Sequence, residues 1–186
     1  MVRIYTKKGD DGSTGLLFGG RVPKDDARTR VYGTLDETVS ALGVARAAGL
    51  PGEIAEITVR IQRELFVVGA QLATAPDNHH KLEPGISRIT PDMTAQAEND
   101  IDRLLAIHPL PQEFILPGES MASAGLDLAR SVVRRAEREA VSMHRASELD
   151  DAEVLRYLNR VSDLLFVLAR YVEGEAGVRA QPSRPR

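Results

Sequence analysis

Apolar residues recur at intervals of three or four positions through most of the chain after residue 24, which is the spacing of amphipathic helices. Gly49 and Pro51 interrupt the pattern after the first helical segment, and Thr90 followed by Pro91 is typical of a hydroxyl-capped helix start. The pattern predicts five helices, over residues 25–48, 52–73, 90–108, 119–144 and 150–173. Five helices with mostly short links and no series of strand-like segments predict an all-α fold, an up-and-down bundle in a single domain of residues 1–186.

Three segments fall outside this periodicity. Residues 1–24 are rich in glycine and basic residues and are expected to form a loop-like arm, in which the runs RIY and GLLF could be strand or extended chain. The tract TAPDNHHKLEPGISR has the composition of a loop. The polar end of the chain, residues 174–186, contains two prolines and is expected to be a flexible tail. The bundle would therefore occupy residues 25–173.

Composition narrows the classes of function. The chain has no cysteine, which excludes disulfides, thiolate zinc sites and iron–sulfur clusters. It shows neither a signal-peptide pattern nor an apolar run approaching the roughly 18 residues of a membrane span, so we expect a soluble, cytoplasmic protein without a membrane partner. A net charge of −3 gives no general attraction to nucleic acid. Any binding of a polyanion must come from a local basic cluster.

Such a cluster occurs in LDLARSVVRRAEREAV, residues 126–141. Arg130, Arg134 and Arg138 follow one another at intervals of four, where like charges on a helix repel. Arg130 and Arg134 also border the stripe predicted to be buried, where guanidinium groups need carboxylate or phosphate partners. Two interpretations stay open: nearby acids neutralise a solvated face, or the stripe binds a phosphorylated ligand. The predicted buried stripe consists of Leu126, Ala129, Val133, Ala136 and Ala140.

Polar residues also interrupt two other predicted helices. Asn159 and Asp163 lie next to the apolar face of residues 150–173, where an unpaired polar group would cost about 1–3 kcal/mol. The position of Asn159 beside this apolar face therefore predicts either a hydrogen bond between helices or a contact with a ligand. In GTLDETVSALG, Asp36 and Glu37 stand within a small, apolar run, and one of them could face an arginine.

The segment YTKKGDDGSTG, residues 5–15, combines three glycines with two lysines. It does not fit the Walker pattern, because its lysines precede the glycines. Alone it is typical of a mobile arm. Together with the arginine stripe and with Lys24 of RVPKDD it is one of three basic elements that would suit a triphosphate.

These motifs resemble, in the same order, those of the PduO-type ATP:cob(I)alamin adenosyltransferases. The resemblance runs from RIYTKKGDDGSTGL through RVPKDD, GTLDETVSALG, FILPG and RSVVRRAERE to YLNRVSDLLFVLARY. It implies a five-helix bundle that forms a homotrimer with its active sites between subunits. It further implies transfer of the 5'-deoxyadenosyl group of ATP to Co(I) of a corrinoid, with release of triphosphate.

The resemblance also implies roles for individual residues. Asp36 would pair with Arg130 of a neighbouring subunit, and Phe114 would lie against the corrinoid. Arg134 and Arg138 would bind phosphate, and Asn159 would bind the nucleotide. Magnesium would be held largely by ATP oxygens, without a protein ligand that we can assign. The implied triphosphate-binding arm comprises Thr6, Lys7, Lys8, Gly9, Thr14 and Lys24, and the opposite wall comprises Arg134, Arg135, Ala136, Glu137 and Arg138.

The chain departs from the family pattern at three points, and two other functions remain open. Lys8 stands where the family commonly has threonine, and Glu119 follows FILPG where a second glycine is usual. The tail also lacks the aromatic residue that some members place over the corrinoid. An ATP-dependent kinase or hydrolase could use the same cradle, although it would need a placed carboxylate base and a defined magnesium site. A corrinoid carrier or regulatory trimer would bind nucleotide without chemistry. A reductase and an adenosylcobalamin-dependent acceptor enzyme are the further partners that the resemblance implies.

Overall fold

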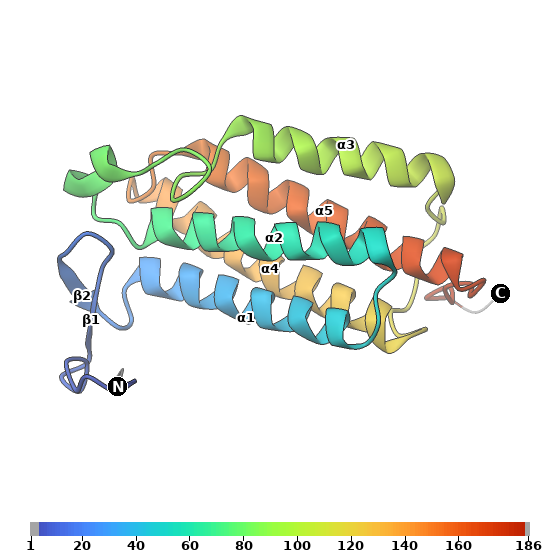
Figure 1. The fold of residues 1–186 in the computed structure, drawn as a ribbon, viewed down its shortest axis with the longest axis horizontal. Helices are drawn as coiled ribbons and strands as arrows, with labels where there is room; N and C mark the ends of the chain where they lie inside the picture. The colour runs from blue at the N-terminus through green and yellow to red at the C-terminus, as the bar shows by residue number, and fades with distance from the viewer. Residues whose placement is uncertain (1–3, 185–186) are drawn as a thin grey trace.

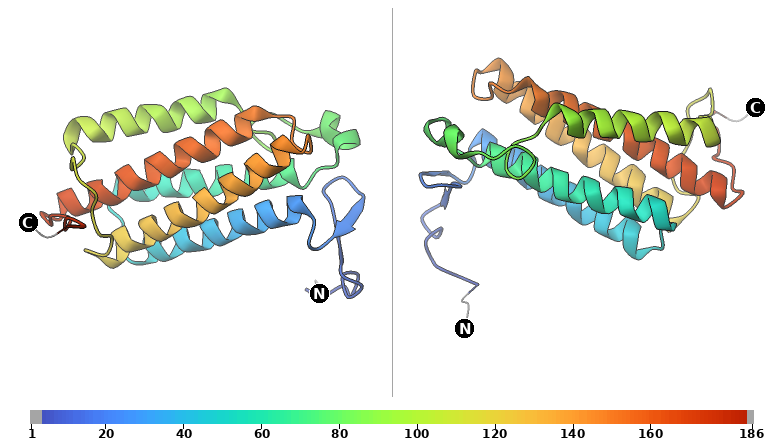
Figure 2. Two further views of the ribbon diagram at one scale, coloured as in Figure 1. Left: turned by 180° about the vertical axis from the view of Figure 1, so that it is seen from behind. Right: turned by 45° about the horizontal axis from the view of Figure 1, so that its top comes forward.

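The computed structural model describes residues 4–184 and consists mainly of five long helices in which successive helices run in opposite directions (Figure 1). Helix α1 packs against α2 and α4, α5 packs against α4, and α3 covers α5 on the outer side (Figure 2). The predicted all-α up-and-down bundle is confirmed. Within residues 4–184, no helix has the length and apolarity that crossing a membrane requires. The helices are α1 Ala27–Ala47, α2 Gly52–Leu72, α3 Pro91–Ile107, α4 Met121–Arg145 and α5 Ala152–Glu175.

Polar side chains at the helix starts explain most of these boundaries. The Asp26 carboxylate accepts a hydrogen bond from the backbone N–H of Arg28 at 2.8 Å and caps α1. Ser120 and Ser123 bond reciprocally at the start of α4. The predicted cap at Thr90 is wrong in detail: the residue precedes α3, but its hydroxyl makes no capping hydrogen bond, and Pro91 begins the helix. The fixed φ of Pro91 and its missing backbone N–H suit the first position of a helix.

The predicted buried stripe of α4 is confirmed, since Leu126, Ala129, Val133, Ala136 and Ala140 have no exposed surface. Small residues let α4 approach α1 closely. A Cβ atom added at Gly125 would lie 2.9 Å from the Cα atom of Ala45. This close packing fixes the position of α4, which carries the arginines, relative to α1.

The N-terminal arm contains a short antiparallel hairpin, which the sequence pattern did not locate. Strands β1 Ser13–Gly15 and β2 Arg21–Pro23 form it, so RIY contributes no strand within the described residues, and GLLF begins only as β1 ends. Leu17 N–H donates to the Ala73 carbonyl at 2.8 Å and joins the arm to the end of α2. The tract predicted to be a loop contains a 3-10 helix, η1 Pro76–Lys81.

The end of the chain follows a defined path, against the expectation of a flexible tail. Helix α5 extends to Glu175, and Gly177 adopts a positive φ of 65° just beyond it. Leu116 N–H then donates to the Gln181 carbonyl at 2.8 Å, and Ser183 N–H donates to the Phe114 carbonyl at 2.7 Å. The tail thus pairs with the backbone of the segment that carries Phe114. Residues 1–3 of the predicted arm and 185–186 of the predicted tail lie outside the described residues.

A polar network inside the bundle links α2, α3 and α5. Tyr157, which has no exposed surface, donates a hydrogen bond of 2.6 Å to Glu64. Arg60 contacts the same carboxylate at 3.3 Å and donates to Asp100 at 2.6 Å. Burial raises the pKa of Glu64 above its ordinary value, although the Tyr157 hydroxyl and Arg60 act in the opposite direction.

This raised pKa predicts a specific pH dependence of stability. The folded chain holds the Glu64 proton more tightly than the unfolded chain does, so the contribution of Glu64 to stability is lost as pH rises from its unfolded pKa through its folded pKa. As pH rises above the ordinary pKa of a glutamate, we therefore expect the unfolding free energy of the wild type to decrease relative to that of Glu64→Gln. Urea unfolding at a series of pH values measures the difference. Parallel curves for the two proteins would contradict the prediction.

Candidate functional site

A groove of about 720 Å³ runs along α4 and α5 and is closed at one end by the loop that follows α3. Arg130 and Arg134 enter it from α4, and Phe114 enters it from the loop. Arg134 Nη1 donates to the Ser162 hydroxyl of α5 at 3.4 Å, and Phe114 is 89% exposed. The groove thus joins two guanidinium groups and a large exposed aromatic side chain, all three predicted as site residues from the sequence.

Arg130 is held differently from Arg134. Its guanidinium carbon lies 5.4 Å from the centre of the Phe166 ring, within the range of a cation–π interaction. Its Nε atom lies 3.6 Å from a carboxylate oxygen of Asp127 on the preceding turn. The sequence did not single out Phe166, because a helical apolar pattern does not show which aromatic side chain faces a cation.

Glu137 and Asn159, which the sequence predicted to lie near the nucleotide, meet between α4 and α5. Asn159 donates a hydrogen bond of 3.0 Å to Glu137, so the inter-helix interaction anticipated for Asn159 is present. Asn159 is exposed rather than enclosed by apolar neighbours, which leaves its amide accessible to a ligand. Arg138, one residue beyond Glu137, is also exposed.

Two members of the predicted arginine wall point away from the groove. Arg135 forms an ion pair with Glu37 of α1. Ala136 has no exposed surface and packs in the core. The 100° step of the helix directs Arg134 and Arg135 to different neighbours. Of the predicted wall from Arg134 to Arg138, Arg134 is the member that lines the groove.

Asp36 lies on a different face from Arg130. It is exposed on α1 and lines a second groove, of about 470 Å³, between α1 and α2. Leu17 and Phe66 line the same groove, and Phe66 is 62% exposed. Within one chain, the predicted partners Asp36 and Arg130 thus lie on separate surfaces. This separation is compatible with a pair that forms between two subunits.

The glycine-rich arm is folded by its own hydrogen bonds. The Asp11 carboxylate accepts hydrogen bonds from the hydroxyl and the backbone N–H of Ser13, and these hold the pKa of Asp11 below its ordinary value. Arg21 of β2 bonds the Ser13 hydroxyl and the Lys8 carbonyl. Thr14 lies within β1, and Thr6 accepts a hydrogen bond from Lys8 N–H at 3.4 Å. The loop is thereby shaped before any ligand is bound.

Lys24 lies against the loop at Gly9. A Cβ atom added at Gly9 would lie 3.2 Å from the Lys24 ammonium nitrogen and 3.2 Å from the Ser13 carbonyl oxygen. Lys7 adopts a positive φ of 60°, which turns the chain sharply just before Gly9. Two of the predicted basic elements, the loop and Lys24, are therefore in contact.

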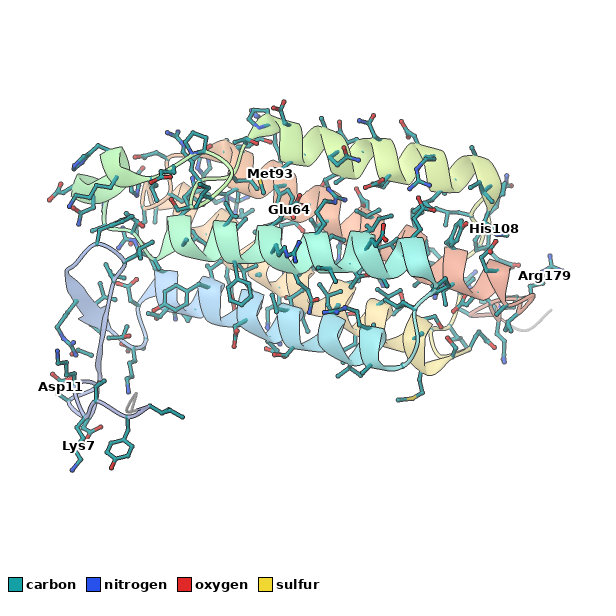
Figure 3. The ribbon with its side chains drawn as sticks, viewed as in Figure 1. Lys7, Asp11, Glu64, Met93, His108 and Arg179 are labelled. Atoms are coloured by element: carbon teal, nitrogen blue, oxygen red, sulfur yellow. The ribbon has the colours of Figure 1, made fainter. Side chains whose placement is uncertain are left out.

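The arm and the groove are far apart in one chain. Figure 3 shows Lys7 and Asp11 at one end of the molecule and His108 and Arg179 at the other. The loop that closes the groove directly follows His108, at the end of α3 remote from the arm. None of Thr6, Lys7, Lys8, Gly9, Thr14 and Lys24 lines the groove. One chain thus carries both predicted walls of the site but does not bring them together.

Substituting Gly9 tests whether this loop geometry matters for binding nucleotide. Gly9→Ala would press a methyl group against Lys24 and the Ser13 carbonyl, and the flexible lysine would move first. We expect the dissociation constant for ATP to rise about fivefold while helical content stays unchanged, because a misplaced cation weakens a charge-assisted contact. Isothermal titration calorimetry measures this constant, with Gly15→Ala as the control, since no atom lies within 4 Å of an added Cβ there and Gly15 does not have a positive φ. Equal losses in both variants would contradict the prediction.

The described residues contain no group of three or more histidine, aspartate or glutamate side chains arranged to hold a metal ion. The chemistry of the site thus resides, as far as residues 4–184 show, in cations, an amide–carboxylate pair and aromatic surfaces. Such a set can bind a polyphosphate and a large planar ligand.

The chain is similar to known proteins over most of its length. The family model for cobalamin adenosyltransferase matches residues 4–172. A corrinoid adenosyltransferase of Citrobacter freundii is 42% identical over 173 residues, covering 93% of this chain and 96% of that protein. Corrinoid adenosyltransferase PduO of Salmonella typhimurium is 39% identical over 175 residues, covering 93% of this chain and 50% of that protein.

A solved structure is similar throughout its length. It is a variant of a PduO-type ATP:corrinoid adenosyltransferase from Lactobacillus reuteri complexed with cobalamin and ATP, with a TM-score of 0.87 and 31% identity, covering 98% of this chain and all of that one. The resemblance read from the sequence motifs is confirmed. The chain belongs to the cobalamin adenosyltransferase family.

Proposed function

We propose that the protein transfers the 5'-deoxyadenosyl group of ATP to Co(I) of a corrinoid, forming adenosylcobalamin and releasing triphosphate. The observation that carries the proposal is the groove that places Arg130, Arg134 and exposed Phe114 together. The guanidinium group of Arg134 suits the phosphates, and the aromatic surface, with Arg130 beside it, suits a macrocycle.

The reaction is a displacement at the ribose 5'-carbon. Co(I) donates an electron pair to that carbon, a Co–C bond forms, and the C–O bond to the triphosphate breaks with its electrons passing to the leaving group. No protein nucleophile or general base is needed. Catalysis then rests on positioning and on cations that stabilise the charge gathering on the triphosphate. Arg134 supplies this charge from α4, and Lys7 and Lys24 supply it from the arm.

Magnesium would accompany ATP through phosphate oxygens. The groove contributes no cluster of carboxylates that fits a protein-held magnesium ion, and the described residues contain none elsewhere. We therefore assign no ligand and derive no step from such an ion.

The two walls would come from neighbouring subunits of a homotrimer. Three features support this arrangement: the separation of arm and groove in one chain, the exposed pair Leu17 and Phe66 on the second groove, and the position of Asp36 beside them. The arm of one subunit would complete the groove of the next, and Asp36 would reach Arg130 across the contact. Closed rings form from such head-to-tail interfaces.

The products of the reaction test the proposal. The protein is incubated with cob(II)alamin, a reductant, ATP and magnesium, and we expect the adenosylcobalamin spectrum together with stoichiometric triphosphate. Formation of ADP would instead indicate phosphoryl transfer, as in a kinase or hydrolase. Nucleotide-dependent spectral change without product would indicate a carrier.

A further inference from the structure

A buried group of three charged residues lies behind the groove, between α4 and α5, and the reaction as described does not use it. Arg170 of α5 donates to Asp127 of α4 at 2.6 Å and to Glu173 at 2.9 Å. The side chains of Arg170, Asp127 and Glu173 are only 5%, 6% and 2% exposed. We call these three residues the buried triad.

The buried triad contacts the groove through Arg130 and Phe166. The Phe166 ring lies close to two guanidinium groups, with its centre 5.4 Å from the guanidinium carbon of Arg130 and 5.1 Å from that of Arg170. Asp127 is shared by the same two arginines: one oxygen is 2.6 Å from Arg170, and the other is 3.6 Å from Arg130 Nε. Arg130 is thus linked to the triad both directly and through the ring.

The charges of the buried triad favour one position of Arg130. One guanidinium and two carboxylates give a net charge of −1, which attracts Arg130 and is weakly screened because the triad is buried. Arg130 and Asp127 do not form a tight pair. Arg170 already binds one oxygen of Asp127, and the distance of 3.6 Å from Arg130 Nε to the other oxygen exceeds the length of a hydrogen bond. Among residues 4–184, Arg130 Nε is buried without a hydrogen-bond partner, and Asp127 is the one acid that forms an ion pair with Arg130.

We propose that the buried triad is the positioning device of Arg130: it holds the Nε side of Arg130 against Phe166 without neutralising it, so that the guanidinium group stays directed into the corrinoid side of the groove. The assignment rests on the proposed function. Asp127 is the central positioning residue, since it is the member of the triad whose carboxylate contacts both Arg170 and Arg130. Because Arg170 already binds one oxygen of Asp127, Asp127 does not form a short hydrogen bond with Arg130.

Asp127→Asn tests the assignment, because it keeps the shape of the side chain and leaves Arg170 paired with Glu173. We expect the dissociation constant of cob(II)alamin in the presence of ATP to rise about tenfold, as for the loss of one charge-assisted contact. The dissociation constant of ATP should change less than about twofold. Spectral titration measures the first and calorimetry the second. If Asp127→Asn does not fold, Glu173→Gln lowers the same negative charge and should shift corrinoid binding in the same direction.

Asp100→Asn is the matched control. Asp100 and Asp127 are each 5% exposed and each accepts a 2.6 Å hydrogen bond from an arginine, but Asp100 pairs with Arg60, away from the groove. We expect Asp100→Asn to leave corrinoid binding unchanged. Similar losses in both variants would show a purely structural role and overturn the assignment.

A double-mutant cycle distinguishes positioning from a separate contact. If Asp127 acts through Arg130, Asp127→Asn should change corrinoid binding less than about twofold in an Arg130→Met background. Independent, multiplying effects would overturn the inference, as would wild-type binding by Asp127→Asn alone. A wild type that forms no adenosylcobalamin would overturn the proposed function itself, and the inference with it.

Discussion

Arg134→Ala should lower the rate of adenosyl transfer by about 100-fold to 1000-fold, the range measured when one preorganised donor to a developing anion is removed. Arg134 lies in the groove, where its guanidinium group donates a hydrogen bond of 3.4 Å to the Ser162 hydroxyl of α5. Its charge would act mainly on the leaving triphosphate, so the loss should appear in turnover more than in corrinoid affinity. Steady-state formation of adenosylcobalamin at saturating ATP measures it.

The control for this variant is Arg145→Ala, which removes another exposed arginine from the same helix, outside the groove. Both variants should retain the helical circular dichroism of the wild type, because both side chains are exposed. A wild-type rate from Arg134→Ala would remove its assigned role. Equal losses in the two variants would point to a general effect of surface charge.

Phe114→Ala should bind ATP normally but turn over poorly when Co(II) is reduced on the protein, with a loss of about 100-fold. A large side chain that is 89% exposed on the groove has little packing to lose, so its removal should leave the fold intact. Its role would be to exclude water and the axial ligand from cobalt, which makes the reduction to Co(I) easier. Each tenfold loss of rate corresponds to about 1.4 kcal/mol of barrier.

Pre-reduced corrinoid separates the two steps in this variant. We expect chemically prepared cob(I)alamin to restore most of the rate of Phe114→Ala, since the difficult reduction is bypassed. Ile86→Ala serves as a control, because Ile86 is 69% exposed and lies outside the groove. Wild-type rates with both forms of corrinoid would contradict the assignment.

The tail that pairs with residues 114–116 gives this segment a support that its sequence does not reveal. The contacts are backbone hydrogen bonds from Leu116 to Gln181 and from Ser183 to Phe114. Backbone pairing leaves little trace in the pattern of side chains, and two prolines made the tail look disordered. The hairpin of the arm escaped notice for a similar reason, since its three-residue strands are too short to show alternation.

The helices were predictable because each carries a continuous apolar stripe, and the match was closest in α4, whose buried face was named residue by residue. The site was predictable only in part. Regular spacing located Arg130 and Arg134 at the edge of the stripe, but the ion pair of Arg135 with Glu37 depends on where α1 packs. The contact of Phe166 with Arg130 depends likewise on how α4 packs against α5.

The central claim is that cations from two chains act on one triphosphate, and mixing two defective variants tests it most directly. One variant lacks Lys7 and Lys24 in the arm, and the other lacks Arg134 in the groove. Reassembled from equal amounts, a ring with shared sites should recover about a quarter of the wild-type activity, because a quarter of the arm–groove contacts then join two intact walls. Mixtures no more active than the separate variants, with subunit exchange shown by mass spectrometry, would contradict the account.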